Sequence, residues 1–192
     1  MISQPEHSIV ISTIGDFDAE LLKSLSREIN RLFAYPTELM PLLEHVDFSL
    51  DTGRNQYHST LILEKLADTA PPWAVKVLAI IDVDLFIPIL THVYGEAQLG
   101  GKTCIISTYR LKDGLPSMNA QEVFLGRVVK EALHELGHTF NLRHCRDHTC
   151  LMHYCRSERD VDRKSDELCR YCGILLEDML KKGRRRNHPL FL

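Results

Sequence analysis

Residues 134–144 read His-Glu-Leu-Gly-His-Thr-Phe-Asn-Leu-Arg-His, and the rest of the chain is best understood as support for this stretch. His134 and His138 are four residues apart, so on a helix their rings project from one face, one turn apart. Two neutral imidazoles at this spacing can hold one zinc ion. Zinc lowers the pKa of a bound water to about 7, and Glu135 lies beside the first histidine, where it can accept that proton.

A third histidine at residue 144 extends the pattern. A straight helix would carry His144 away from the first two histidines, because six residues are not a whole number of turns. Asn141 lies between them, and asparagine is one of the few non-glycine residues that adopt a left-handed backbone. We therefore predict that the helix ends near Asn141 and that the chain turns back. His144 would then be a third ligand, and the fourth position would stay open for water.

The segment before the histidines has the period of a long helix. Asn119 and Glu122 have the spacing of a capping box at its start. Apolar residues then recur at helical spacing, at Phe124, Leu125, Val128, Val129, Ala132, Leu133 and Leu136. We expect this face to pack under a sheet while the histidines face a cleft.

Upstream, apolar strand patterns alternate with helical ones. We predict strands at 7–14, 38–50, 74–88 and 103–111, a glycine-rich edge strand at 94–102, and helices at 16–34 and 56–67. Strand–helix alternation of this kind predicts an α/β fold with parallel neighbouring strands. A last helix is expected at 166–180, followed by the basic run 181–186.

Composition narrows the class of protein. The chain has 192 residues, of which 44% are hydrophobic and 26% charged, as in globular proteins, and its net charge of −3 argues against a nucleic-acid-binding protein. We see neither a leader at the N-terminus, Met1-Ile2-Ser3-Gln4-Pro5-Glu6-His7, nor a membrane span. We expect a cytoplasmic monomer that binds neither nucleic acid nor membrane, and whose six cysteines serve as thiolates for metal rather than as disulfides.

The histidine stretch resembles the extended motif of the metzincins, with Asn141 in place of the usual glycine. Residues 150–154, Cys-Leu-Met-His-Tyr, look like the Met-turn of that clan. Together with Cys145 and the sequence Cys-Arg-Tyr-Cys at 169–172, the pattern resembles that of the archaemetzincins. The specific motifs run from 134 to 172, and the region before them matches only in its coarse plan.

The resemblance implies a metzincin-like twisted mixed β-sheet with an edge strand and a long active-site helix. Residues 1–144 would form an N-terminal subdomain, and residues 145–192 a small C-terminal subdomain with the Met-turn and the final helix. Met152 would pack beneath the three histidines without binding the metal. Tyr154 matches a tyrosine that some metzincins place near the metal, as a ligand or as a hydrogen-bond donor to the oxyanion, and plain packing is the alternative. A peptide would add as a strand along Gly95–Gly101.

Four thiolates can bind a second zinc in a closed, structural site. The spacing supplies one pair at Cys169 and Cys172 and another at Cys145 and Cys150, but it does not exclude Cys155 as a substitute for Cys150. The resemblance favours Cys145, Cys150, Cys169 and Cys172, and so two zinc ions per chain, one catalytic and one structural.

These features favour a zinc-dependent peptidase in which Glu135 is the general base. Two alternatives remain open. The same chemistry serves non-peptide amides and esters, so the chain could be another zinc hydrolase. It could also be a zinc-binding interaction module with a vestigial catalytic site, although an intact Glu135 counts against that reading.

Overall fold

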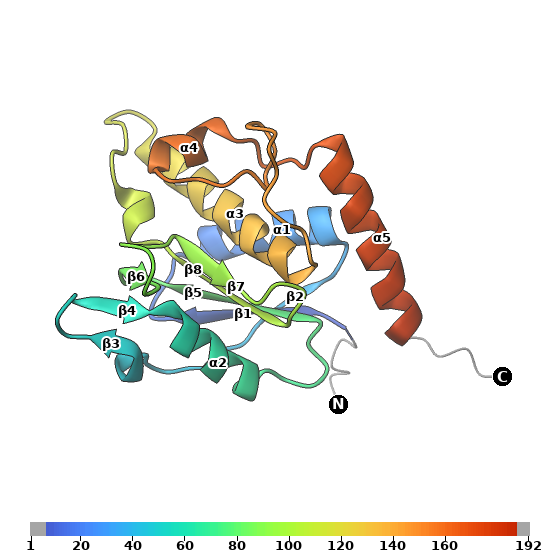
Figure 1. The fold of residues 1–192 in the computed structure, drawn as a ribbon, viewed down its shortest axis with the longest axis horizontal. Helices are drawn as coiled ribbons and strands as arrows, with labels where there is room; N and C mark the ends of the chain where they lie inside the picture. Colours follow the sequence, from blue (N-terminus) through green and yellow to red (C-terminus); the bar gives the residue numbers. More distant parts are fainter. Residues whose placement is uncertain (1–6, 188–192) are drawn as a thin grey trace.

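The structure, a computed structural model, describes residues 7–187 and the side chains of residues 7–183. Its centre is a five-stranded sheet with the strand order β2-β1-β5-β8-β7 (Figure 1). The strands are β1 (Ile9–Ile14), β2 (Thr37–Leu39), β5 (Lys76–Ile81), β7 (Gly95–Ala97) and β8 (Thr103–Ser107). All neighbours pair in parallel except β7, which pairs antiparallel with β8 at the edge. The predicted α/β fold with a mixed sheet and an edge strand is therefore confirmed.

Helices cover both faces of this sheet. Side chains of successive strand residues point to opposite faces, so apolar strands present two faces that must be buried. On one face, α1 (Ala19–Phe33) and α3 (Ala120–Thr139) enclose a core with Ile9, Leu78 and Ile106. On the other face, α2 (Ser59–Thr69) encloses a second core with Val10, Val77 and Ile105. A smaller sheet of β3 (Leu50–Asp51), β4 (Gln56–His58) and β6 (Leu85–Phe86) lies beside α2 (Figure 1).

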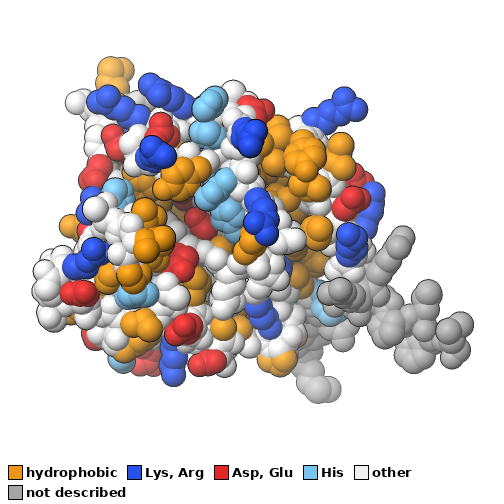
Figure 2. Space-filling model, in the orientation of Figure 1, with side chains coloured by type: hydrophobic (Ala, Val, Ile, Leu, Met, Phe, Trp, Pro, Cys, Tyr) orange, Lys and Arg blue, Asp and Glu red, His pale blue; other side chains and the backbone are white. Residues whose placement is uncertain are grey.

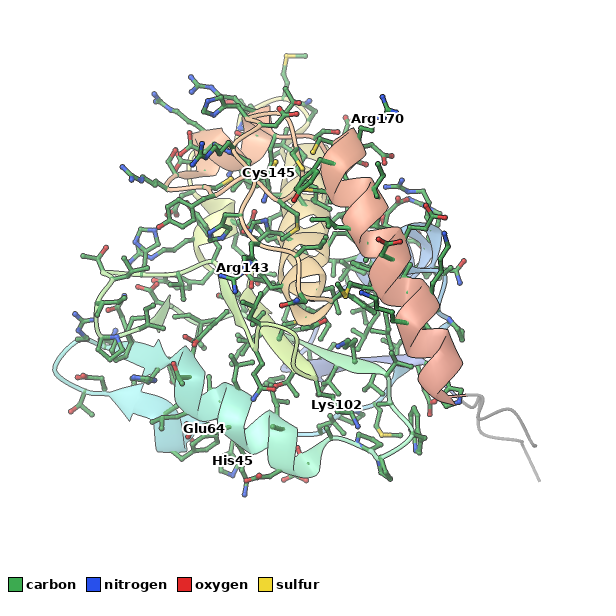
Figure 3. All side chains as sticks on the ribbon, turned by 45° about the vertical axis from the view of Figure 1, so that its right-hand side comes forward. His45, Glu64, Lys102, Arg143, Cys145 and Arg170 are labelled. Carbon is green, nitrogen blue, oxygen red and sulfur yellow. The ribbon has the colours of Figure 1, made fainter. Side chains whose placement is uncertain are left out.

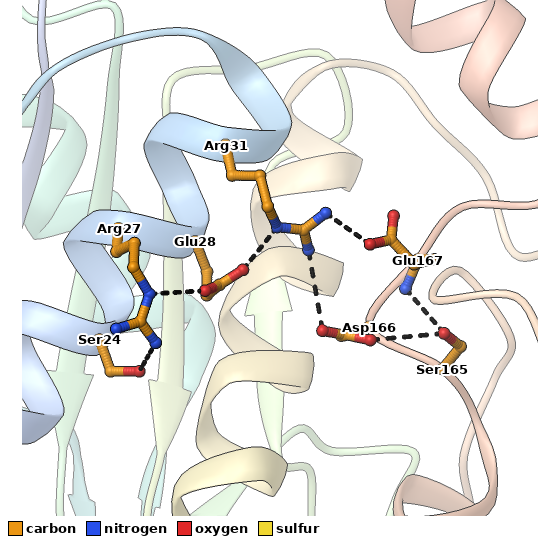
Figure 4. Close-up of polar contacts among 7 residues, drawn as sticks. All are labelled: Ser24, Arg27, Glu28, Arg31, Ser165, Asp166 and Glu167. Atoms are coloured by element: carbon orange, nitrogen blue, oxygen red, sulfur yellow. Dashed lines mark hydrogen bonds and ion pairs between the residues drawn. The ribbon is translucent and has the colours of Figure 1, made fainter.

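The C-terminal part, with α4 (Glu158–Arg163) and α5 (Arg170–Asn187), lies on the α1–α3 side of the sheet (Figure 1). Arg31 of α1 ties the segment before α5 to this layer, with contacts of 2.6 Å to Glu167 and 3.7 Å to Asp166 (Figure 4). The backbone oxygen of Glu167 accepts a hydrogen bond from Leu151 N at 2.8 Å. The loop that carries Met152 is thereby linked to α1. Within residues 7–187, no helix is long and apolar enough to cross a bilayer.

Several expected elements have different bounds. The strand expected at 38–50 ends at Leu39, shortly before Pro41, which has no N–H group to continue the ladder. The stretch 74–88 forms β5 and then the separate β6, and 56–67 begins as β4 before α2. The capping box at Asn119 is wrong, because this residue has a left-handed φ of 52° and its side chain makes no capping hydrogen bond. The N-terminal residues 1–6 and the side chains of Arg184, Arg185 and Arg186 lie outside the described residues.

Candidate metal centre and active-site cleft

The chain bends at the end of α3, and this bend brings His144 back towards His134 and His138 on the helix. Asn141 has a φ of 66°, in the left-handed region. Its backbone N–H donates to His138 O at 2.9 Å, and Leu142 N–H donates to Gly137 O at 3.0 Å. These two bonds form a Schellman motif, which satisfies the last carbonyls of the helix. The predicted reversal near Asn141 is confirmed.

Substitutions at Asn141 test how much this bend depends on its conformation. Asn141→Gly should keep the stability, whereas Asn141→Ala should lower the free energy of unfolding by about 1–2 kcal/mol, because a Cβ disfavours the left-handed backbone. Urea unfolding of both variants, with zinc content per chain measured in parallel, checks this expectation. Equal stability of the two variants would contradict it.

The three histidines converge on one point. His138 Nε2 lies 3.1 Å from His134 Nε2 and 3.2 Å from His144 Nε2. His134 Nδ1 lies 2.9 Å from Leu151 O, and His138 Nδ1 lies 2.8 Å from Leu142 O. A carbonyl only accepts hydrogen bonds, so both Nδ1 atoms carry the proton and both Nε2 atoms present a lone pair.

This donor set fits zinc. Lone pairs that face each other at such distances repel unless a cation lies between them, and tetrahedral zinc with Zn–N bonds of 2.0–2.1 Å would separate the nitrogens by roughly 3.4 Å. Burial lowers the pKa of His134 and of His138, and it lowers the pKa of His144 to about 4. All three rings are therefore neutral near pH 7, which is the form that binds metal.

The three histidines and the edge strand β7 line a cleft with a volume of about 840 Å³. Glu135 lies in this cleft as well. Figure 2 shows histidine side chains and a carboxylate near the middle of this face, with basic side chains beside them. Burial raises the pKa of Glu135 well above its ordinary range, with further contributions from the neighbouring carboxylates of Glu131 and Glu96. A zinc ion held by the histidines would instead lower the pKa of Glu135, because a nearby dication favours the carboxylate form.

Gly95 of β7 lets the edge strand pass close to Glu135. A Cβ at this position would lie 2.7 Å from Glu135 Cγ and 2.6 Å from Ile105 O, which is closer than side chains tolerate. Gly95→Ala should therefore displace Glu135 or the edge strand and lower kcat/KM by tenfold or more, since small shifts of reacting groups are costly in catalysis. Gly126→Ala is the matched control, because a Cβ there meets nothing within 4 Å. Initial rates of peptide cleavage check this expectation, and equal rates for the two variants would contradict it.

A buried ion pair lies behind His134, and the sequence patterns did not reveal it. Lys164, whose side chain is 0% exposed, holds its Nζ 2.8 Å from Glu131 Oε1 and 3.4 Å from His134 Nδ1. The contact with Glu131 is an ion pair rather than an aligned hydrogen bond, since that oxygen has no hydrogen-bond partner among the described residues. Glu131 precedes His134 by three residues, so the two side chains lie on the same face of α3. Helical spacing alone could therefore have predicted that Glu131 lies near His134. Nothing in the sequence places Lys164 there.

Four cysteines form a second cluster. The sulfurs of Cys145, Cys150, Cys169 and Cys172 all lie within 4.8 Å of one another. Cys145 Sγ is 3.8 Å from Cys169 Sγ, close to the roughly 3.8 Å that tetrahedral zinc with Zn–S bonds of 2.3 Å requires. Cys155, left open by the spacing, is not in the cluster, and its Sγ lies 3.6 Å from His153 O instead. The donor set fits a closed zinc site.

The remaining predicted residues lie near these centres. Met152 is fully buried against α3, where a Cβ on Gly137 would meet its Sδ at 2.6 Å. Tyr154 lines the cleft, with its ring centroid 5.0 Å from that of His144.

The acidic residues Asp82 and Asp84, which follow β5 directly, pair with basic side chains. Asp84 accepts hydrogen bonds of 2.6 Å from both Nε and Nη2 of Arg110. Asp82 forms an ion pair with Lys112 at 2.6 Å. These pairs hold the turn after β8 and lie outside both clusters.

The sequence of this chain is similar to those of a known protein family. The family model described as Peptidase family M54 matches residues 7–178. An archaemetzincin of Methanocaldococcus jannaschii is 36% identical over 173 residues, which cover 88% of this chain and 93% of the relative.

Solved structures agree in fold. The crystal structure of the archaemetzincin of Methanopyrus kandleri has a TM-score of 0.78 at 30% identity and covers 94% of this chain and 99% of that one. A zinc-dependent peptidase of Methanocorpusculum labreanum has a TM-score of 0.76 at 25% identity and covers 88% of this chain and 100% of that one. The chain therefore belongs to peptidase family M54, the archaemetzincins, and is a zinc-dependent metallopeptidase.

Proposed function

We propose that His134, His138 and His144 hold the catalytic zinc of this metallopeptidase and that Glu135 is its general base. The convergence of three Nε2 lone pairs beside a buried carboxylate, in one cleft under a free strand edge, is the observation that supports this proposal. When bound, zinc polarises the substrate carbonyl and acidifies water.

Each side chain then has a distinct task. Glu135 accepts the proton of the attacking water and delivers it to the leaving amine. Leu151 O and Leu142 O hold the tautomers of His134 and His138, so that the same nitrogen of each ring always faces the centre. The free edge of β7 offers backbone groups with which an extended peptide can pair above Glu135. Tyr154, whose ring lies beside that of His144, would donate a hydrogen bond to the oxyanion.

We further propose that the four cysteines hold a second, structural zinc. Cys145 follows His144 directly, and Cys150 precedes Met152 by two residues. An ion at this cluster would fix the third histidine and the Met-turn against the start of α5. Residues 1–144 and 145–192 would then form a large and a small subdomain, the second fastened by the metal rather than by a core of its own.

Peptidase activity is tested by digesting a peptide library with the zinc-loaded protein, with the protein treated with 1,10-phenanthroline, and with the treated protein after zinc is restored. Cleavage that is lost and then regained supports the proposal. Hydrolysis of simple esters or non-peptide amides without cleavage of peptides would favour the alternative hydrolase. No hydrolysis of either class, with zinc bound, would favour a vestigial site.

A further inference from the structure

Two arginines line the candidate cleft without an acidic partner among the described residues. Arg143 immediately precedes His144, and Arg156 follows Tyr154 by two residues. Both side chains are exposed, and the ion pairs in this part of the chain join other residues. In the view of Figure 3, Arg143 lies between Cys145 and the helix α2 that carries Glu64.

The carboxylates of three acids in this region are engaged by groups other than the two guanidiniums. Glu131 pairs with Lys164, and Glu96 accepts a hydrogen bond from Thr60 Oγ1 at 2.9 Å. Asp160 caps α4, and its Oδ2 accepts hydrogen bonds from the backbone N–H groups of Arg156 and Ser157 and from the hydroxyl of Ser157, but it forms no ion pair with the guanidinium of Arg156. Two guanidinium groups therefore lie on the wall of the cleft without an ion pair among the described residues, while Glu96 is held by hydroxyl groups and Glu135 is buried at the base.

Both arginines lie close to the reacting centre. Arg143 is the chain neighbour of His144, and the guanidinium of Arg156 lies 6.0 Å above the ring of Tyr154, which itself packs beside His144. An extended peptide rises by about 3.3 Å per residue. Groups of a bound peptide that can reach either guanidinium therefore belong to residues within about three positions of the scissile bond.

We propose that Arg143 and Arg156 make the cleft select substrates with a carboxylate within about three residues of the scissile bond. A guanidinium binds a carboxylate through two parallel hydrogen bonds, which gives both attraction and orientation. The carboxylate could belong to an Asp or Glu side chain or to the C-terminus of the peptide. This inference rests on the proposed peptidase function and names its substrate class.

Matched peptides separate the two sources. One pair carries Glu or Gln at a position flanking the cleaved bond, with an amidated C-terminus. A second pair has no acidic residue and ends in a free carboxylate or in an amide. We expect kcat/KM to be roughly tenfold higher for the acidic member of at least one pair, as charge-assisted hydrogen bonds give, and the ratio to fall as salt is raised.

Substitutions of Arg143 and Arg156 test whether these two residues cause the preference for a carboxylate. Arg143→Gln and Arg156→Gln should each reduce the acid-to-amide ratio, and the double variant should bring it close to one. Arg159→Gln is the control, because Arg159 is highly exposed in the same segment and does not line the cleft. Its ratio should equal that of the wild type.

Measuring peptide binding separates the test of the carboxylate preference from the test of catalysis. Fluorescence anisotropy with the same labelled peptides and zinc-loaded Glu135→Gln protein gives the acid-to-amide ratio of Kd values without turnover. A preference that is lost in the arginine variants supports the inference, even if the wild type cleaved no peptide and the proposed function failed. Ratios near one in both pairs, by rate and by binding, would overturn it.

Discussion

Replacing Glu135 with Gln is expected to lower kcat for peptide hydrolysis by about 10²–10⁴-fold, the range that a positioned general base contributes. The amide keeps the size of the side chain but cannot take up a proton at neutral pH. Because Glu135 is not part of the cluster of histidine nitrogens, the zinc content should not change. Initial rates on a quenched fluorescent peptide, measured with the metal content of the same samples, check both expectations.

Glu64→Gln is a suitable control for the Glu135 variant. Glu64 is an exposed glutamate on α2 and does not line the cleft, so the same chemical change there should leave rate and metal content unaltered. A Glu135→Gln protein with a rate within threefold of the wild type would refute the role as base. Loss of zinc together with activity would instead indicate that this carboxylate helps to hold the metal.

The features that could be predicted from the sequence are those set by local rules. The bend after α3 depends on a left-handed residue at a helix end, and Asn141 is one of the residue types that accept this conformation. The apolar runs of β5 and β8 reflect burial on both faces, which requires continuous rather than alternating hydrophobicity. Short-range spacing was therefore sufficient to locate α3 and these two buried strands, whereas the strand order β2-β1-β5-β8-β7 was not predicted.

The features that could not be predicted depend on contacts between distant segments. Lys164 reaches the back of His134 across 30 residues of sequence, and neither residue indicates the other. Gly95 is required by the close passage of β7 over Glu135, 40 residues later in the chain. The wrong prediction at Asn119 has a local origin instead, since the right residue spacing for a capping box does not fix the backbone conformation that the cap needs.

The double substitution Cys169→Ser and Cys172→Ser is expected to remove one of two zinc ions per chain and to lower the melting temperature by about 10 °C or more. Structural zinc sites contribute several kcal/mol or more to folding, and a chain of this size loses roughly 2–4 °C per kcal/mol. The loop that carries Met152 follows Cys150 directly, so loss of the ion would release it from the start of α5, while the ion pairs of Arg127 with Asp162 and of Lys164 with Glu131 would still hold the region of α4 against α3. The loop around Met152 should therefore become open to proteolysis before the core of the sheet unfolds.

Cys155→Ser is the matched control, since Cys155 is half-buried in the same segment but lies outside the cluster. It should keep both zinc ions and nearly the wild-type melting temperature. Metal analysis and calorimetry of the wild type, the double variant and the Cys155→Ser variant check these expectations. An unchanged zinc count in the double variant would refute the structural site. Activity adds a further distinction, because Cys145 adjoins His144. If the cysteine-bound ion holds the third histidine in place, the double variant should also bind its remaining zinc more weakly, and a chelator should inactivate it at lower concentration than the control.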